Sequence, residues 1–280
     1  MNPSDQRARA IRLRALHHGA DILVLPNAWD VATARIFAAS GAAAIATTSG
    51  GIAAALGHPD GEQVSCENML TVIARIAEAV TVPVTADIES GYASSSAGVA
   101  TVIQAVLETG AVGVNLEDAD HHHAGPLVDM ALHVAKIRAA RGAADRAGVP
   151  LVINARTDVF LAAVGPQEDR LPCAIRRANA YLDAGADSAF VPGVRDAETI
   201  ASLAREIEGP LNILAGPGVP PVADLHGLGV ARVSVGSGPA RAALALVQRI
   251  ARELLGQGSY QAFCEQQLSQ DDITALLAYR

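Results

Sequence analysis

The chain has 280 residues, of which 50% are apolar and 18% are charged, with 29 acidic and 21 basic side chains. This apolar share can bury a large core, so the composition excludes a disordered chain, a collagen-like chain and a small disulfide scaffold. The net charge of −8 comes without a basic stripe, which argues against a nucleic-acid partner. Aromatic residues make up only 3%, so Val, Ile, Leu and Ala must form the core.

The N-terminus and the cysteines favour a cytoplasmic protein. No apolar run approaches the ~18 residues that span a bilayer, and Met1–Asp5 lacks the apolar stretch of a signal peptide. Cys66, Cys173 and Cys264 are odd in number and far apart, which fits buried thiols in a reducing compartment. We therefore expect no membrane partner and give a structural zinc site little weight.

Short β-like runs alternate with amphipathic helical stretches along most of the chain. Eight strands are predicted, at Ile22–Pro26, Ala43–Thr48, Val82–Ile88, Val112–Glu117, Leu151–Thr157, Ser188–Pro192, Leu211–Ala215 and Arg232–Gly236. The predicted helices are Val31–Ala39, Glu67–Val80, Ala97–Thr109, Met130–Ala147, Cys173–Ala184, Ala197–Glu208, Val222–Leu228 and Ala240–Leu255.

This alternation predicts a (β/α)8 TIM barrel. Gly41, Gly110, Gly185 and Gly229 each follow a helix and precede a strand, where a left-handed glycine ends a helix. An open dinucleotide-binding sheet is disfavoured, because no glycine-rich phosphate loop follows the first strand. We expect a single barrel domain over residues 1–280 whose tail, 259–280, forms one or two extra helices that pack on a neighbouring subunit.

Acidic side chains end two neighbouring strands of the predicted barrel. Asp87 and Glu89 end the third strand, and Glu117 and Asp118 end the fourth, at the edge where barrel active sites lie. Such a set repels itself unless a cation binds, and oxygen ligands suit Mg²⁺ or Mn²⁺. Each carboxylate alone could equally cap a helix or pair with an arginine, but together they predict a divalent metal site.

Other strand ends supply groups for an anionic substrate. Arg156 can bind a carboxylate through two parallel hydrogen bonds, and the backbone amides of Ser49, Gly50 and Gly51 can approach an oxyanion. Together with a metal, these groups would stabilise the enolate of a 2-oxo acid. Trp29 is either core filler or an apolar wall beside this site.

A run of three histidines, His121–His123, follows the fourth strand within the segment Asp118–Pro126. Consecutive residues cannot easily face one ion, so we assign them no metal. Two interpretations remain open with equal weight. The segment is either a solvated turn or a mobile lid in which one imidazole, with His123 as our candidate, donates a proton.

Over roughly residues 20–260 the sequence resembles the isocitrate lyase and phosphoenolpyruvate mutase superfamily. The motifs that carry the resemblance are Pro26–Asp30, Thr48–Gly51, Gly57–Asp60, Asp87–Tyr92, Asn115–Asp118 and Ala155–Asp158. The resemblance implies a Mg²⁺-dependent barrel that makes or breaks a C–C or P–C bond next to a 2-oxo acid. It also implies a homo-oligomer, a dimer or a tetramer, in which the terminal helix is exchanged between subunits.

The resemblance also implies roles for individual residues. Asp87 resembles the direct metal ligand, with Glu89 and Glu117 holding its waters and Asp60 completing the acidic set. Trp29, Ser49, Gly50 and Arg156 resemble the contacts to the substrate carboxylate and oxyanion. Glu89 stands where the family usually has Asp, which lengthens one ligand arm.

Departures from the family motifs bear on the reaction. Segment 118–126 has neither the Lys and Cys of the isocitrate-cleaving members nor the Lys- and Asn-bearing loop of the mutases. Our first hypothesis is therefore a metal-dependent C–C lyase or decarboxylase for a small 2-oxo or 2-hydroxy acid. A phosphoryl mutase is the second, and a metabolite-binding barrel without turnover is the third. Val191–Gly193 and Asn212 are expected to line the variable part of the pocket.

Overall fold

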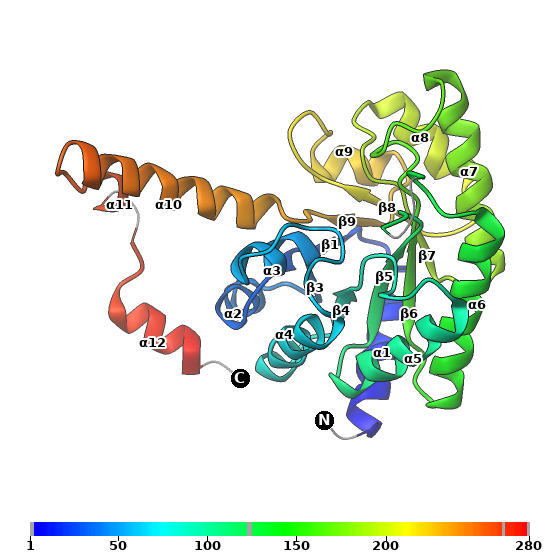
Figure 1. Ribbon diagram of the computed structural model, residues 1–280, viewed down its shortest axis with the longest axis horizontal. Coiled ribbons are helices and arrows are strands. Elements are labelled where there is room, and N and C mark those ends of the chain that lie inside the picture. Colours follow the sequence, from blue (N-terminus) through cyan, green and yellow to red (C-terminus); the bar gives the residue numbers. More distant parts are fainter. Residues whose placement is uncertain (1–2, 122–124, 265–266, 279–280) are drawn as a thin grey trace.

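The computed structural model describes residues 3–121, 125–264 and 267–278. Its strands form one parallel sheet in the order β1-β9-β8-β7-β6-β5-β4-β3-β2. They span β1 Leu23–Leu25, β2 Asn27–Ala28, β3 Ile45–Thr47, β4 Val84–Asp87, β5 Gly113–Glu117, β6 Val152–Arg156, β7 Ser188–Phe190, β8 Leu211–Leu214 and β9 Arg232–Ser234. The two ends of the sheet, β1 and β2, are consecutive in the chain, so the sheet curls into a nearly closed barrel (Figure 1).

The first barrel strand is split at Pro26, which separates β1 from β2. Proline has no N–H to donate, and here β1 pairs with β9 whereas β2 pairs with β3. The carboxamide of Asn27 spans this seam. Its Nδ2 donates to the Thr47 carbonyl (2.8 Å), and its Oδ1 accepts from the amides of Val235 and Gly236 (both 2.9 Å). One side chain thus joins the first strand to segments on both of its sides.

Helices surround the sheet and confirm the predicted barrel. They span α1 Pro3–Leu16, α2 Val31–Ala39, α3 Ser49–Ala55, α4 Cys66–Ala79, α5 Ser96–Glu108, α6 Met130–Arg146, α7 Gln167–Asp183, α8 Ala197–Glu206, α9 Val222–Gly227, α10 Gly238–Gly256, α11 Gln261–Cys264 and α12 Gln270–Ala278. In the described part of the chain, no helix is both long and apolar enough to cross a bilayer.

Two helices, α1 and α3, were not predicted, and one helix begins earlier than predicted. Leu13 of α1 is fully buried beside the barrel strands, where a Cβ on Gly113 would lie 2.8 Å from its Cδ2 atom. The predicted start of α7 at Cys173 is wrong, because the helix begins at Gln167 and continues through Pro172. Acidic residues in its first turn, Glu168 and Asp169, favour this earlier start.

The C-terminal helices extend away from the barrel. Figure 1 shows α10 projecting from the barrel, with α11 and α12 following it. Helix α12 returns to α2, where Arg35 donates to the carbonyl of Leu277. In the described residues, eight of the thirteen exposed large apolar side chains belong to residues 244–277. The expected extra helices are confirmed, whereas their exchange between subunits stays a prediction.

Candidate active site

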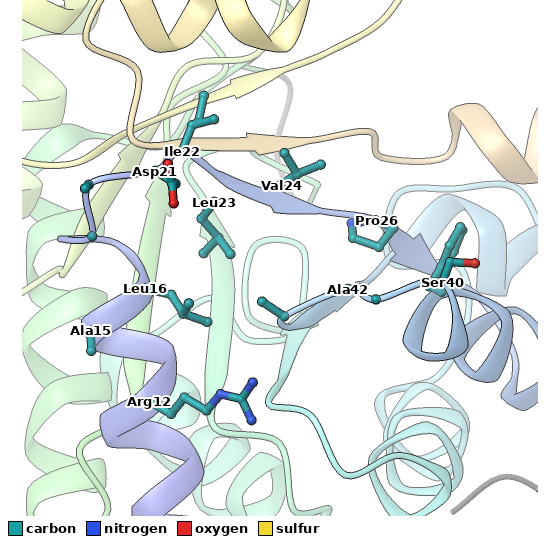
Figure 2. Close-up of a pocket in the computed structure, with 15 residues that line it drawn as sticks. Arg12, Ala15, Leu16, Asp21, Ile22, Leu23, Val24, Pro26, Ser40 and Ala42 are labelled. Carbon is teal, nitrogen blue, oxygen red and sulfur yellow. The ribbon is translucent and has the colours of Figure 1, made fainter.

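Two cavities lie in different parts of the barrel. The larger one, about 700 Å³, is lined mainly by apolar residues of the end of α1, of β1 and of the segment before β3 (Figure 2). The smaller one, about 250 Å³, lies where strands end, and polar side chains of many strands line it. Barrel active sites are found at the carboxyl ends of the strands, so the smaller cavity is the candidate site.

Asp87, the last residue of β4, is held by three hydrogen bonds. Its Oδ2 accepts from the Ser49 amide (3.0 Å), and its Oδ1 accepts from Asn115 Nδ2 (3.0 Å). Its own amide donates to Thr47 Oγ1 (2.8 Å). The carboxylate therefore has a fixed orientation in the cavity wall.

The segment Ser49–Gly51 begins α3 and has no room for larger side chains. Thr48 caps the helix, and its hydroxyl accepts from the Gly51 amide (3.4 Å). A Cβ on Gly50 would lie 2.8 Å from Asp60 Oδ2, and a Cβ on Gly51 would lie 2.6 Å from Thr48 Cγ2. Gly50, Ser49 and Asp60 line the cavity, whereas Gly51 packs behind them. The glycines thus let backbone amides come close to a bound anion.

Arg156 lines the same cavity and is already paired with two carboxylates. Its Nη1 lies 2.7 Å from Glu117, and its Nε and Nη2 donate to the two oxygens of Asp158 at 2.5 and 2.7 Å. Burial opposes the charge of Arg156, but Glu117 and Asp158 outweigh it and raise its pKa. The two-bond geometry expected for a substrate carboxylate is therefore occupied by Asp158. One N–H on each Nη remains for a ligand.

Glu89 and His121 lie next to the ion pair of Arg156 with Glu117. Glu89 accepts hydrogen bonds from the Glu62 amide (2.5 Å) and from Tyr92 Oη (2.9 Å), with a left-handed φ of 51°. Burial and the charge of Asp87 raise its pKa to about 7. His121 Nε2 lies 3.0 Å from Glu117 Oε1 and 3.9 Å from Glu89 Oε2, and the hydrogen bond to Glu117 raises its pKa. His122 and His123 lie outside the described residues.

The oxygen-only donor set fits a hard divalent cation. Asp87 and Asp60 line the cavity, and burial together with repulsion from Asp87 raises the pKa of Glu89, a repulsion that a cation would relieve. Within the described residues, however, no three His, Cys, Asp or Glu side chains already form a ligand cluster. The metal therefore stays a prediction.

Several residues predicted from the sequence lie outside the cavity wall. Asp118 is fully buried and accepts from Tyr181 Oη (2.7 Å) and Arg177 Nη1 (2.9 Å), so it is not part of the acidic set. Trp29 packs against the main core cluster. Asn212 is fully buried and donates to Ser234 Oγ (3.1 Å) without lining the cavity.

Other cavity residues were not predicted, namely Thr85, Asn115, Arg232, Ser234 and Arg241. Thr85 lies two positions before Asp87, and Asn115 lies two before Glu117. Side chains of a strand alternate between its faces, so this spacing is the signal that could have found them. A charged residue inside a buried strand, Arg232, is a second signal of the same kind.

Comparisons with known proteins identify the family of this chain. The profile of the phosphoenolpyruvate phosphomutase family matches residues 13–255. An uncharacterised Mycobacterium tuberculosis protein is 40% identical over 237 residues, which cover 85% of this chain and 86% of the relative. A crystal structure from Burkholderia cenocepacia J2315 has a TM-score of 0.91 and 36% identity, covering 98% of this chain and 97% of that one.

A relative with a named activity is the 2-methylisocitrate lyase of Escherichia coli. It is 32% identical over 179 residues, which cover 61% of this chain and 58% of that enzyme. The fold, the strand-end residues and the profile match therefore agree: this chain belongs to the phosphoenolpyruvate phosphomutase family of the isocitrate lyase superfamily.

Proposed function

We propose that the protein is a divalent-metal-dependent lyase or decarboxylase that cleaves a C–C bond of a small 2-oxo or 2-hydroxy acid. The observation that carries this proposal is the juxtaposition of Asp87 with the Ser49–Gly51 amides in a cavity of about 250 Å³. A cavity of this volume suits a small metabolite. Its carboxylates suit a metal, and its amides suit an oxyanion.

Each acidic residue has a role in this proposal. Asp87 would be the direct ligand of Mg²⁺ or Mn²⁺, Glu89 and Glu117 would hold its waters, and Asp60 would complete the acidic set. When bound, the metal acts as a Lewis acid that stabilises the enolate of the substrate. Glu117 also orients Arg156, because the two side chains form an ion pair of 2.7 Å.

The remaining groups bind the substrate and move protons. The Ser49 amide already donates to Asp87 and the Gly51 amide to Thr48, so the Gly50 amide donates the backbone hydrogen bond to the substrate carboxylate or oxyanion, and Arg156 contributes its two free N–H groups. Among the described imidazoles, His121 lies beside Glu117 and Glu89, with its pKa raised by the contact to Glu117. His121 is therefore the candidate proton donor, in place of the His123 expected from the sequence.

A phosphoryl mutase is the second candidate, and the family profile supports it by its name. The lyase or decarboxylase is favoured because segment 118–126 lacks the Lys- and Asn-bearing loop of the mutases, whereas release of CO₂ or a small oxo acid needs the enolate-binding groups but not the Cys-bearing loop. A small enclosed site that binds an enolate without turnover is the third candidate.

The deciding experiment incubates the purified protein and Mg²⁺ with oxaloacetate, 2-methylisocitrate, 2,3-dimethylmalate and phosphonopyruvate in separate reactions. Release of a 2-oxo acid or CO₂ from a carbon substrate, lost in Asp87→Ala, would support the lyase. Conversion of phosphonopyruvate alone would favour the mutase. Binding of oxalate without turnover of any of the four would favour the binding protein.

The proposed assembly is a homo-oligomer in which the arm, defined as α10 to α12, covers a second subunit. Leu244, Val247, Leu255 and Tyr260 of the arm are between 52% and 86% exposed. The larger cavity beside β1 is lined by Val24, a strand residue that is 44% exposed (Figure 2). An apolar helix face and an uncovered strand are complementary surfaces.

A further inference from the structure

The candidate site continues below Asp87 to a buried arginine. Arg232 of β9 lines the cavity, and only 2% of its surface is exposed. Its Nη1 lies 3.3 Å from His17 Nε2, while its Nε has no hydrogen-bond partner. Among the described residues, no carboxylate lies within ion-pair distance of its guanidinium. A positive charge thus stands at the bottom of the cavity without a direct counter-ion.

His17 orients Arg232 but does not neutralise it. His17 Nδ1 donates to the Leu13 carbonyl (2.8 Å), which leaves Nε2 to accept from Arg232. Burial and the nearby Arg232 lower the pKa of His17 to about 3, so the imidazole is neutral. Burial lowers the pKa of Arg232 to about 9 against the attraction of Asp87, so the guanidinium is still charged at neutral pH. A buried charge without a counter-ion is costly, and a bound anion would offset that cost.

Two hydroxyl groups near Arg232 also have protons to donate. Thr85 Oγ1 is buried without a partner, and Ser234 Oγ accepts from Asn212 Nδ2 (3.1 Å), which leaves its own proton free. Both residues line the cavity. By contrast, Asn115 is engaged on both sides: its Nδ2 donates to Asp87, and its Oδ1 accepts from Asn154 (3.0 Å each). The cavity floor thus offers hydrogen-bond donors and a positive charge.

We propose that Arg232, Thr85 and Ser234 form a subsite for a carboxylate, which makes the protein selective for diacids. This inference rests on the proposed function, in which the other end of the ligand binds at Asp87 and the Ser49–Gly51 amides. Arg156 cannot supply the same two-bond contact, because Asp158 already occupies that edge of its guanidinium. Arg232 is the buried cation of the cavity wall that has no carboxylate of its own.

Calorimetric titration with three small acids, each with Mg²⁺ present and with a parallel assay for turnover, tests the subsite. Oxalate probes the end at Asp87, while malate and lactate differ by the one carboxylate that the floor would bind. We expect the wild type to bind malate at least about tenfold more tightly than lactate, the size of one charge-assisted contact. Arg232→Met and Thr85→Val should both reduce this preference, Arg232→Met to near unity, with oxalate affinity changed by less than about threefold.

Three comparisons separate the subsite from a purely structural role. Arg205→Gln removes an equal charge from an exposed ion pair with Glu206 and should leave all three affinities unchanged. The melting temperature of ligand-free Arg232→Met should equal or exceed that of the wild type, because an unpaired buried charge is removed. If Arg232→Met does not fold, Arg232→Lys, which keeps the charge but lacks Nε, should lose part of the preference.

The inference is wrong if the preference for malate is undiminished in Arg232→Met or Arg232→Lys, or if Arg241→Gln abolishes it instead. These outcomes leave the proposed function intact as long as oxalate binds with Mg²⁺. Failure of the wild type to bind oxalate would contradict the proposed function itself.

Discussion

Two cavities of this barrel differ in their walls and in what they can hold. The smaller one is lined by Asp87, Arg156 and Arg232, and hydrogen bonds to neighbouring side chains fix Asp87 and Arg156. The larger one, outside β1, has an apolar wall and the exposed strand residue Val24 (Figure 2). A rigid polar cavity suits a small anion, whereas an open apolar groove suits a helix. Our proposals therefore place chemistry and assembly in different parts of one fold.

The largest expected effect is on the polar cavity. Asp87→Ala removes the proposed direct metal ligand together with the contacts to Ser49 and Asn115. We expect turnover to fall by more than about 100-fold and chelation with EDTA to have the same effect. Activity assays with added Mg²⁺ would check this. Turnover that persists after thorough chelation would rule out the metal.

His121→Ala tests the proton donor in the same cavity. We expect turnover to fall by about 100-fold, the contribution typical of a general acid, while oxalate still binds. A matched control is His58→Ala, since His58 is an exposed imidazole that does not line the cavity. Equal activity of the two variants would leave solvent as the proton source.

A charge placed on the arm tests whether the arm packs against the larger cavity of a second subunit. Val247 of α10 is 59% exposed, so Val247→Glu should leave the subunit folded but separate the oligomer into monomers. Light scattering at micromolar concentration would measure the mass. The control is Ile11→Glu, which places the same charge on the exposed face of α1, where Ile11 is 54% exposed. This variant should preserve the assembly. A wild type that is already monomeric would contradict the assembly.

The smallest effect concerns His17, which lies between the two cavities. Its pKa is lowered to about 3 by burial and Arg232, so the unfolded chain binds a proton below about pH 6.5 that the folded chain does not. The contribution of neutral His17 to the free energy of unfolding is fully present above about pH 6.5 and is lost as the pH falls toward 3. Between pH 7.5 and pH 5 we expect a loss of about 2 kcal/mol that is absent in His17→Asn. Urea unfolding at both pH values would measure it, and equal pH dependence of the two proteins would refute it.

The sequence predicts the barrel well, because its cues are local and repeated. Each strand is a short apolar run, and each glycine after a helix marks the return to the sheet. Helix α1 has no such cue, because its sequence is rich in arginine and its buried side, with Leu13, is narrow. The start of α7 was misplaced because Pro172 resembles a helix start, although tertiary packing tolerates it inside the helix.

The candidate site is predicted in part. Strand ends identify Asp87, Glu117 and Arg156, because the barrel brings those ends to one edge. The sequence leaves open how Arg156 divides its hydrogen bonds, since Asp158 competes with any ligand for the same donors. Glu117 and Asp118 are neighbours in sequence but have different partners. Glu117 forms an ion pair with Arg156 at the candidate site, whereas Asp118 forms one with Arg177 of α7.

The break between β1 and β2, which the side chain of Asn27 spans, affects where the barrel wall is held most weakly. Between β2 and the segment after β9 the connection is one carboxamide, which accepts from Val235 and Gly236 and donates to Thr47. Elsewhere around the sheet, neighbouring strands are joined by backbone ladders. The β1–β9 ladder holds the adjoining part of this interface, so thermal fluctuations should loosen the barrel wall first beyond that ladder, beside Gly236 and Ser237. Both residues line the candidate site, so the wall should yield most readily next to the cavity.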